Sequence, residues 1–574
     1  MRLAAGYVLM VLLGFQVQAV GQTQSFGPDT YRIGAFTGQG TTKPGLNCDG
    51  SSSRGRVCTG FLASAVDGAL LDVTLAVPAG NGPFPLVTVL HGWGGSKGGL
   101  GYIADPLLAD GNAVLRYSAR GFGDSWGQVN LADVHVEMED LRSMIGQVID
   151  DGRLRLDADA VGIVGVSYGG GQSWLALLHP FFATPRGTNV RIRTVVPIVP
   201  WTDLVYSLLP NGRPERSLAP AGSAKLSFIN GLYLSGQRST PARPYSNYPD
   251  YLIAWHAWLN GMEPNTADPV FRQILDGIAG YRSIWWQQDF WRDAARNRVP
   301  VFQIQGLTDD LFPLTEAKRM LLALKSVDAL YPIASYFGDI GHPRAANKDG
   351  EQDYVVDLIR KWFGYYLLGV GAEPAHVVHA AITRSRNQAF DPADVITVES
   401  YAALSTQTLR TKFDASAVLG NPVADPYSGF FWDPLVMEGS RELQPLPPPP
   451  ETVLVPGSAA VYTVGASARP LLIAGQPTVS LRAATSGPRV QLNVRLLDVA
   501  PDGTKQLITR GSFILEAVAS RVDVVIPTYG NVWEAAPDHR LELEITTLDS
   551  PYLAPSRVPS TTEISQVRLD LPIR

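Results

Sequence analysis

The sequence predicts an α/β core with a mostly parallel sheet and helices on both faces, an inserted helical cap, and a C-terminal all-β jelly-roll sandwich. Three observations lead to this fold class. Short apolar runs alternate with amphipathic segments over residues 61–199 and 299–385, the aromatic-rich residues 200–298 interrupt this alternation, and the chain after a proline-rich stretch alternates apolar and polar residues. At 574 residues the chain is also too long for one hydrophobic core.

The N-terminus is typical of a secretory signal peptide over residues 1–19. Met1-Arg2 gives a basic start, an apolar stretch runs from Tyr7 to Leu13, and Val17-Gln18-Ala19 fits a cleavage site. The alternative is a retained membrane anchor, but the apolar stretch is short for a bilayer. We therefore expect a secreted or periplasmic protein with no membrane span after cleavage.

Residues 20–60 are polar and Gly-rich, which favours a lightly ordered N-terminal arm. This arm holds both cysteines of the chain, Cys48 and Cys58. In an exported protein the pair predicts a disulfide, with two free thiols as the alternative. Zinc is not expected, because no histidine lies nearby.

The core should contain buried strands and amphipathic helices in alternation. The expected helices are 136–149 and 352–368, and the latter follows the strand that we expect to be the last of the sheet. The expected strands are 70–77, 84–90, 113–117, 161–166, 195–199, 299–304 and 333–337.

The cap, residues 200–298, lacks buried-strand runs and is rich in tryptophan and tyrosine. Caps of this kind cover the active edge of the sheet, so its aromatic residues, with Trp285 and Trp286 as candidates, are expected to line an apolar substrate site. The alternative for each of them is packing in the cap's own small core.

The jelly roll is expected over residues 386–574, with a stiff linker near 441–451 that includes Pro447–Pro450. Parts of 390–440 are expected to join it. Its clearest expected strands are 478–482, 490–496, 522–526 and 541–545.

Ser167 is the candidate nucleophile. It lies in Gly165-Val166-Ser167-Tyr168-Gly169, directly after a buried strand and directly before an apolar helix, as in the nucleophile elbow of α/β-hydrolases. Ser96 and Ser125 also have glycine two residues to either side, but neither has both the strand and the helix. Ordinary loop serines are the better interpretation of those two.

The serine needs a base, and the base needs an orienting carboxylate, in the chain order Ser, Asp or Glu, His. His342 follows the last expected strand, and Asp309 follows the strand before it. Asp309 is preferred to its neighbour Asp310. The expected oxyanion donors are the backbone N–H groups of Tyr168 and Trp93.

The composition restricts the partners. The chain is 45% hydrophobic and 17% charged, as in globular proteins, and its net charge is −6 without a run of Lys or Arg. Nucleic acid is therefore not an expected partner. No pattern for a metal or an organic cofactor is present, and the oligomeric state is left open.

Taken together, these residues resemble the X-Pro dipeptidyl-peptidase and cocaine-esterase-like (CocE/NonD-type) serine hydrolases. The resemblance lies in His91-Gly-Trp-Gly-Gly, Gly165-Val-Ser-Tyr-Gly-Gly, Gly306-Leu-Thr-Asp-Asp-Leu-Phe and Gly341-His342, and in C-terminal segments such as Ala474–Leu481. It implies the triad Ser167, Asp309 and His342.

The resemblance also implies two features of substrate recognition. Relatives that act on X-Pro peptides or amino-acid esters hold an ammonium group with cap carboxylates, for which Asp250, Glu263 and Asp268 are the candidates here. In some relatives a tyrosine hydroxyl is the second oxyanion donor. Trp93 lies at that place in this chain, so the second donor stays open.

We therefore expect an exported serine hydrolase that cleaves an acyl ester or a short-peptide amide through an acyl-enzyme on Ser167. One alternative is an acyltransferase or β-lactam-type acylase with the same triad. The other is a secreted glycan-binding protein with an inert hydrolase core.

Overall fold

A computed structural model of the protein describes residues 42–212, 218, 221–238, 243, 245–421, 454–516, 521–549 and 552–574. The expected signal peptide and the proline-rich linker lie outside the described residues.

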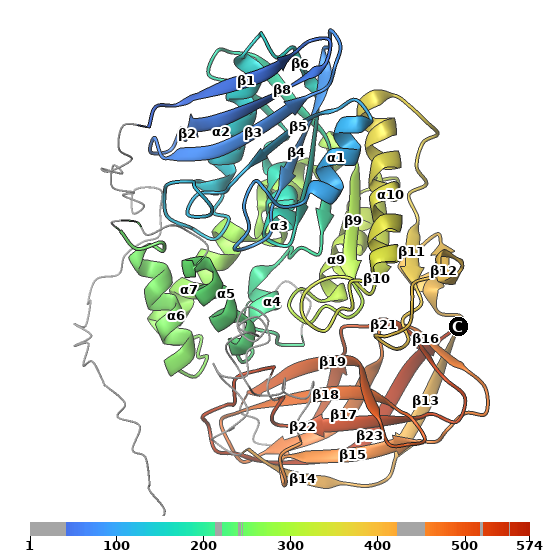
Figure 1. The fold of residues 1–574 in the computed structure, drawn as a ribbon. Coiled ribbons are helices and arrows are strands. Elements are labelled where there is room, and N and C mark those ends of the chain that lie inside the picture. The colour runs from blue at the N-terminus through green and yellow to red at the C-terminus, as the bar shows by residue number, and fades with distance from the viewer. Residues whose placement is uncertain are drawn as a thin grey trace, which may run out of the picture.

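The largest sheet has 12 strands, and its central strands run parallel, which confirms the predicted α/β-hydrolase core (Figure 1). Both faces of these central strands are covered, which explains why they are continuous apolar runs in the sequence. In spatial order the strands are β1 (Gly45–Ser51), β2 (Gly55–Ala63), β3 (Leu70–Val77), β5 (Ala113–Tyr117), β4 (Phe84–Leu90), β6 (Leu156–Val166), β8 (Asn189–Ile198), β9 (Val301–Gly306), β10 (Ile333–Gly338), β11 (Val378–Ala381) and β12 (Val395–Val398), with the short β7 (Phe181–Ala183) paired to β8.

Helices pack on both faces of this sheet. One face is covered by α1 (Gly101–Ala109) and α10 (Asp349–Leu368), and the other by α2 (Glu137–Asp150), α3 (Tyr168–Leu175) and α9 (Leu314–Val327). The parallel strands all end at one edge, so loops that follow β4, β6, β9 and β10 meet there.

The prediction of a lightly ordered N-terminal arm is wrong from Gly45 onward. β1 and β2 form an antiparallel hairpin that continues the sheet through β3, and a disulfide joins Cys48 to Cys58, which face each other across the hairpin. The sequence shows no alternation of apolar residues here, because β1 is an edge strand with most of its side chains exposed.

The core sheet also extends beyond the strand that was expected to be the last. β11 runs parallel to β10, and β12 pairs with β11. The boundary at residue 386 therefore falls too early, since β12 belongs to the core and the first strand of the sandwich is β13 (Gln407–Phe413).

The described residues between β8 and β9 form the helical cap, which lies beside the core in Figure 1. Its helices are α4 (Leu204–Leu208), α5 (Leu226–Arg238), α6 (Asp250–Gly261), α7 (Pro269–Arg282) and α8 (Gln288–Asn297). Aromatic residues hold them together, as in the stacked pair Trp258 and Phe271, whose ring centroids are 4.8 Å apart.

The C-terminal domain consists of two antiparallel sheets around their own apolar core, which confirms the predicted all-β domain. The larger sheet contains β13, β14 (Ala417–Gly420), β16 (Leu471–Gly475), β17 (Thr478–Thr485), β20 (Val522–Pro527), β21 (Asn531–Ala535) and β23 (Thr561–Ile573). The smaller contains β15 (Ala459–Val464), β18 (Arg489–Val499), β19 (Lys505–Glu516) and β22 (Arg540–Thr546).

Candidate active site

Ser167 stands at a strained turn between β6 and α3. Its backbone angles are φ 55° and ψ −108°, a region that residues with a side chain rarely adopt. A Cβ atom at Gly165 would lie 2.2 Å from the carbonyl oxygen of Gly169, and one at Gly169 would lie 2.2 Å from that of Leu90. Side chains at these two positions would therefore force the turn apart, which explains the glycines around the serine.

The structure brings Ser167, His342 and Asp309 into one hydrogen-bonded chain. Ser167 Oγ is 2.7 Å from His342 Nε2, and His342 Nδ1 is 2.7 Å from Asp309 Oδ2. With Nδ1 protonated and donating to the carboxylate, Nε2 is free to accept the serine proton. The three residues come from the loops after β6, β9 and β10, which meet at one edge of the sheet although β6 is far from the other two strands in sequence.

Asp309 is held rigidly in this arrangement. Its Oδ2 also accepts from the backbone N–H of His342 at 3.1 Å, and its Oδ1 accepts from the N–H groups of Leu311 at 2.9 Å and Phe312 at 3.0 Å. The side chain has no exposed surface, whereas that of His342 is 11% exposed. A buried carboxylate with this many donors can orient the imidazole and stabilise its charged form.

His91, at the end of β4, has a structural role. Its Nε2 accepts from the N–H of Ala119 at 2.9 Å, and its Nδ1 is 2.7 Å from the carbonyl oxygen of Gly92. Burial lowers the pKa of His91 to about 4, despite the raising effect of the hydrogen bond to Gly92. The neutral ring thus links the loop after β4 to the loop after β5.

The two expected oxyanion donors belong to segments that lie next to Ser167. The N–H of Tyr168 is in the first turn of α3, where helical N–H groups have no partner within the helix. The loop with Trp93 passes beside the serine, since a Cβ atom at Gly92 would be 3.6 Å from Ser167 Cβ. The indole of Trp93 donates to the carbonyl oxygen of Leu232 at 2.7 Å, so its side chain faces the cap.

A largely apolar cavity of about 110 Å³, here called the cap pocket, opens on the cap side of this loop. Trp93 forms part of its wall, and the Trp93 ring lies 5.2 Å from the ring of Tyr168, the residue after the nucleophile. None of its described lining residues carries a carboxylate or an ammonium group. The lining includes Trp93, Leu131, Ile229, Leu232, Tyr233, Tyr248, Trp255 and His256.

His256 does not bring a charge into the cap pocket. Its ring stacks on Tyr233 at 3.7 Å, its Nε2 is 2.8 Å from Asn230 Oδ1, and burial lowers its pKa to about 4. The imidazole is therefore neutral at pH 7, and the pocket suits an uncharged group.

Trp285 and Trp286, expected to line the substrate site, lie outside the described lining of the cap pocket. The guanidinium carbon of Arg319 lies 4.5 Å from the ring centre of Trp285, and Trp285 also packs edge-on against Trp291. Trp286 follows it in the one-turn helix η3 (Ile284–Trp286). Trp285 thus belongs to the packing between the cap and α9. The aromatic-rich sequence could not separate these positions from those of Tyr233 and Trp255.

The three candidate ammonium-binding carboxylates also lie outside the described pocket lining. Asp250 is exposed in the first turn of α6, and Asp268 caps α7 by accepting from the N–H groups of Val270 and Phe271. Glu263 forms an ion pair with Arg489 of the sandwich at 3.2 Å.

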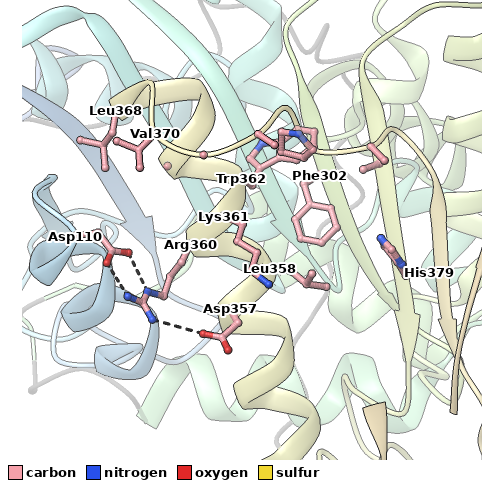
Figure 2. Close-up of a pocket in the computed structure, with 16 residues that line it drawn as sticks. Asp110, Phe302, Asp357, Leu358, Arg360, Lys361, Trp362, Leu368, Val370 and His379 are labelled. Atoms are coloured by element: carbon pink, nitrogen blue, oxygen red, sulfur yellow. Dashed lines mark hydrogen bonds and ion pairs between the residues drawn. The ribbon is translucent and has the colours of Figure 1, made fainter. Parts of the chain in front are cut away.

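A larger cleft of about 740 Å³ lies elsewhere, beside α10 (Figure 2). Phe302 and Ala334 line it near the starts of β9 and β10, whereas the triad lies beyond the ends of these strands. Arg360 spans the cleft wall with ion pairs to Asp110 and Asp357. This cleft contains none of the expected catalytic residues.

Comparison with known proteins agrees with this geometry. Residues 67–342 match the family model for X-Pro dipeptidyl-peptidase (S15 family), and residues 456–566 match that for the X-Pro dipeptidyl-peptidase C-terminal non-catalytic domain. No curated protein sequence matches the chain.

Several solved structures share the fold over nearly the whole chain. An aminopeptidase from the marine sediment archaeon Thaumarchaeota archaeon is 13% identical, with a TM-score of 0.61, and the match covers 94% of this chain and 100% of that one. An α-amino acid ester hydrolase is 16% identical, with a TM-score of 0.61 and the same coverage. A CocE/NonD family hydrolase from Staphylococcus aureus is 11% identical, with a TM-score of 0.62, and the match covers 93% of this chain and 97% of that one.

Proposed function

Because the chain belongs to the X-Pro dipeptidyl-peptidase (S15) family of serine hydrolases, we propose that it hydrolyses carboxylic esters with an apolar, uncharged acyl group through an acyl-enzyme on Ser167. The observation that carries the proposal is the chain of hydrogen bonds from Ser167 through His342 to Asp309. Such a chain supplies a nucleophile, its base and the group that orients the base.

The reaction has two halves. His342 Nε2 takes the proton of Ser167 as Oγ attacks the ester carbon, and the backbone N–H groups of Tyr168 and Trp93 hold the oxyanion. The tetrahedral intermediate collapses, the alkoxide leaves with the proton from His342, and the acyl group stays on Oγ. Water then attacks the acyl-enzyme with His342 as base, which releases the carboxylic acid and restores the serine.

The choice of acyl group rests on the cap pocket. A substrate with a free α-amino group brings an ammonium that needs a carboxylate partner when it leaves water. The described lining of the cap pocket offers aromatic and aliphatic surface instead. An apolar acyl chain gains free energy there by leaving water, at about 25 cal/mol per Å² of buried surface.

Two measurements test the proposal. A fluorophosphonate probe should label the wild-type protein at Ser167 and leave Ser167→Ala unlabelled, whereas a wild type that resists the probe would show that the site is inert. A panel of neutral aryl esters beside Gly-Pro and Ala-Pro anilides should show higher kcat/KM for the esters. A preference for the anilides would overturn the ester proposal and leave the serine mechanism in place.

We also propose that the protein is exported. The basic and apolar N-terminus supports this, as does the disulfide between Cys48 and Cys58, because such bonds persist in oxidising compartments. In the part of the chain that the structure describes, no helix is long and apolar enough to cross a membrane. Fractionation of cells that express the full chain, with mass determination of the N-terminus, would test both export and cleavage.

The two rivals have weaker support. An acyltransferase would pass the acyl group to an added alcohol or amine in preference to water, which product analysis would detect. A glycan-binding sandwich would be expected to expose aromatic rings, but the exposed large apolar side chains among its described residues are aliphatic, such as Val418, Val461 and Val525.

A further inference from the structure

Asp310 connects two loops of the candidate active site. One is the loop after β9, here called the acid loop, which carries Asp309, and the other is the loop after β10, here called the base loop, which carries His342. The two carboxylate oxygens of Asp310 accept from Arg344, at 2.8 Å from Nη2 and 2.9 Å from Nε. Arg344 lies two residues after His342 in the chain. A bidentate pair of this kind fixes both orientation and distance, so the backbone that carries Asp309 and the backbone that carries His342 are held to one another.

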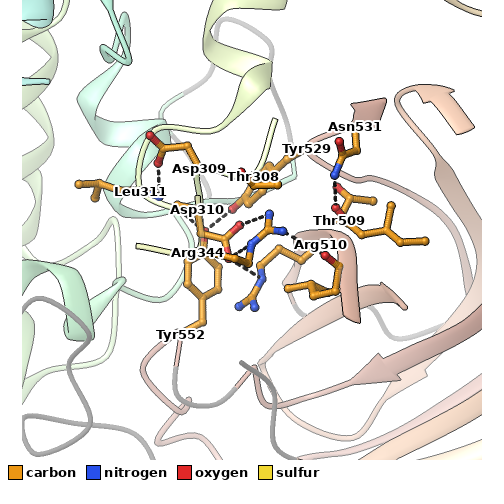
Figure 3. A network of polar contacts seen from close by, with 12 residues as sticks. Thr308, Asp309, Asp310, Leu311, Arg344, Thr509, Arg510, Tyr529, Asn531 and Tyr552 are labelled. Atoms are coloured by element: carbon orange, nitrogen blue, oxygen red, sulfur yellow. Dashed lines mark hydrogen bonds and ion pairs between the residues drawn. The ribbon is translucent and has the colours of Figure 1, made fainter. Parts of the chain in front are cut away.

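The sandwich domain joins the same pair (Figure 3). Arg510, on β19, places Nε 3.2 Å from Asp310 Oδ2 and stacks its guanidinium 4.2 Å from the ring centre of Tyr552. The hydroxyl of Tyr552 donates to the backbone carbonyl oxygen of Asp310 at 2.8 Å. Arg344 reaches back to the sandwich, where it donates to the carbonyl oxygen of Leu507 at 3.1 Å.

The cap supplies a third contact to the acid loop. Lys225, just before α5, is fully buried and donates from Nζ to the carbonyl oxygens of Asp310 at 2.6 Å and Leu311 at 2.9 Å. Its ammonium position is 5.1 Å from the centre of the Tyr552 ring. Three parts of the chain thus converge on two consecutive residues beside Asp309.

The base loop needs such support, because its backbone is strained. Arg344 has φ 102°, which a residue with a Cβ atom rarely adopts, and such conformations persist where surrounding contacts hold them. The pair with Asp310 and the bond to Leu507 are among the contacts that hold it. Loss of one partner would release strain into the loop that carries His342.

The charge balance of this cluster depends on Arg510. Burial alone would raise the pKa of Asp310, but the charges of Arg344 and Arg510 hold it below its usual value. Without Arg510, the buried carboxylate of Asp310 would lose one of the positive charges that stabilise its charged form. The loop that carries Asp310 would then rearrange to bring the carboxylate closer to water.

We propose that the sandwich domain positions the catalytic acid and base through Arg510, which makes Arg510 a positioning residue for the reaction on Ser167. The inference rests on the proposed serine mechanism, and it gives a domain whose matched family model is described as non-catalytic a part in the turnover rate.

The main experiment compares wild type with Arg510→Met and Arg510→Lys in the full-length protein. The readouts are kcat and KM on a neutral aryl ester, the rate of fluorophosphonate labelling at Ser167, and the melting temperature. A displacement of catalytic groups by about 1 Å costs about 100-fold in rate. We expect Arg510→Met to lose about 10- to 100-fold in kcat and labelling rate with KM within about 3-fold, and Arg510→Lys to recover part of the loss.

A folded Arg510→Met that labels and turns over like wild type would overturn the inference and leave the serine mechanism standing. A wild type that neither labels nor hydrolyses esters would instead overturn the mechanism, and the inference with it.

Tyr552→Phe and Tyr529→Phe give a milder matched pair that decides the question if Arg510→Met fails to fold. Tyr552→Phe removes the hydrogen bond to Asp310, whereas Tyr529→Phe removes a hydroxyl that lies 2.9 Å from that of Tyr552 and leaves the bond to Asp310 in place. Slower labelling of Ser167 in Tyr552→Phe than in Tyr529→Phe supports the inference. Equal labelling rates in both variants and in wild type would refute it.

Discussion

Asp309 and Asp310 are adjacent in the chain, yet their carboxylates bind two different residues of the loop after β10. Asp309 Oδ2 is 2.7 Å from His342 Nδ1, and Asp310 Oδ1 is 2.8 Å from Arg344 Nη2. Asp309 therefore orients the imidazole of His342, and Asp310 holds the loop that carries His342 in place through Arg344.

The first prediction tests whether Asp309 orients the base, His342. In Asp309→Asn the carboxamide keeps the shape of the side chain but no longer favours the tautomer with a proton on Nδ1. We expect kcat on an aryl ester to fall about 10⁴-fold in a variant that still folds, as for other triads. Steady-state kinetics and thermal unfolding would check this. A variant with more than a tenth of wild-type kcat would argue against Asp309 as the orienting group.

The sequence predicted the elements that carry the site better than the contacts that support it. Ser167, Asp309 and His342 could be selected because a buried strand ends before each of them and because glycines mark the tight turns around two of them. The parallel strands could be predicted because burial on both faces makes them continuous apolar runs.

The rest depends on contacts over long sequence distances. Arg510 and Arg344 are 166 residues apart, and nothing local to either indicates that both contact Asp310. The β1–β2 hairpin was missed since an exposed edge strand shows no apolar alternation. Trp285 lies outside the described lining of the cap pocket, and composition cannot tell an aromatic residue in the cap's packing from one in its pocket.

The second prediction concerns the elbow. Gly169→Ala would place a methyl group 2.2 Å from the Leu90 carbonyl oxygen, and both atoms sit on backbone that cannot swing aside. We expect a loss of about 1–3 kcal/mol in the free energy of unfolding, together with loss of activity. Gly98→Ala is the control, because its Cβ atom would meet nothing closer than Ser96 Oγ at 3.6 Å. Chemical unfolding of both variants would decide, and equal stability would contradict the geometry.

The third prediction is a pH dependence due to His91. Its folded-state pKa is about 4 and its usual value is 6.5, so between these values the unfolded chain binds a proton that the folded protein does not. The contribution of His91 to the free energy of unfolding is therefore fully present above about pH 6.5. About 3 kcal/mol of it is lost as the pH falls toward 4.

Comparison with a variant isolates this contribution, because Glu137 acts in the opposite direction. Burial raises the pKa of Glu137 to about 7, so its contribution falls as the pH rises. His91→Gln keeps an oxygen that can accept from the N–H of Ala119. We expect the difference in unfolding free energy between wild type and His91→Gln to shrink as the pH is lowered from 7 to 4, as measured by urea unfolding. A constant difference would show that His91 does not titrate differently on folding.

The fourth prediction tests where the acyl chain binds. Ile229 lines the cap pocket, and a larger ring at this position would occupy part of a cavity of about 110 Å³. Ile229→Trp should therefore lower kcat/KM for a hexanoyl aryl ester by about 10- to 100-fold, since each methylene in such a pocket contributes about 1–3 kcal/mol. The acetyl ester, which has no methylene chain to place in the pocket, should lose less than about 3-fold. Ile229→Val is the control, because it changes the same residue without filling the cap pocket. An equal loss for both esters in Ile229→Trp would place the acyl chain outside the cap pocket.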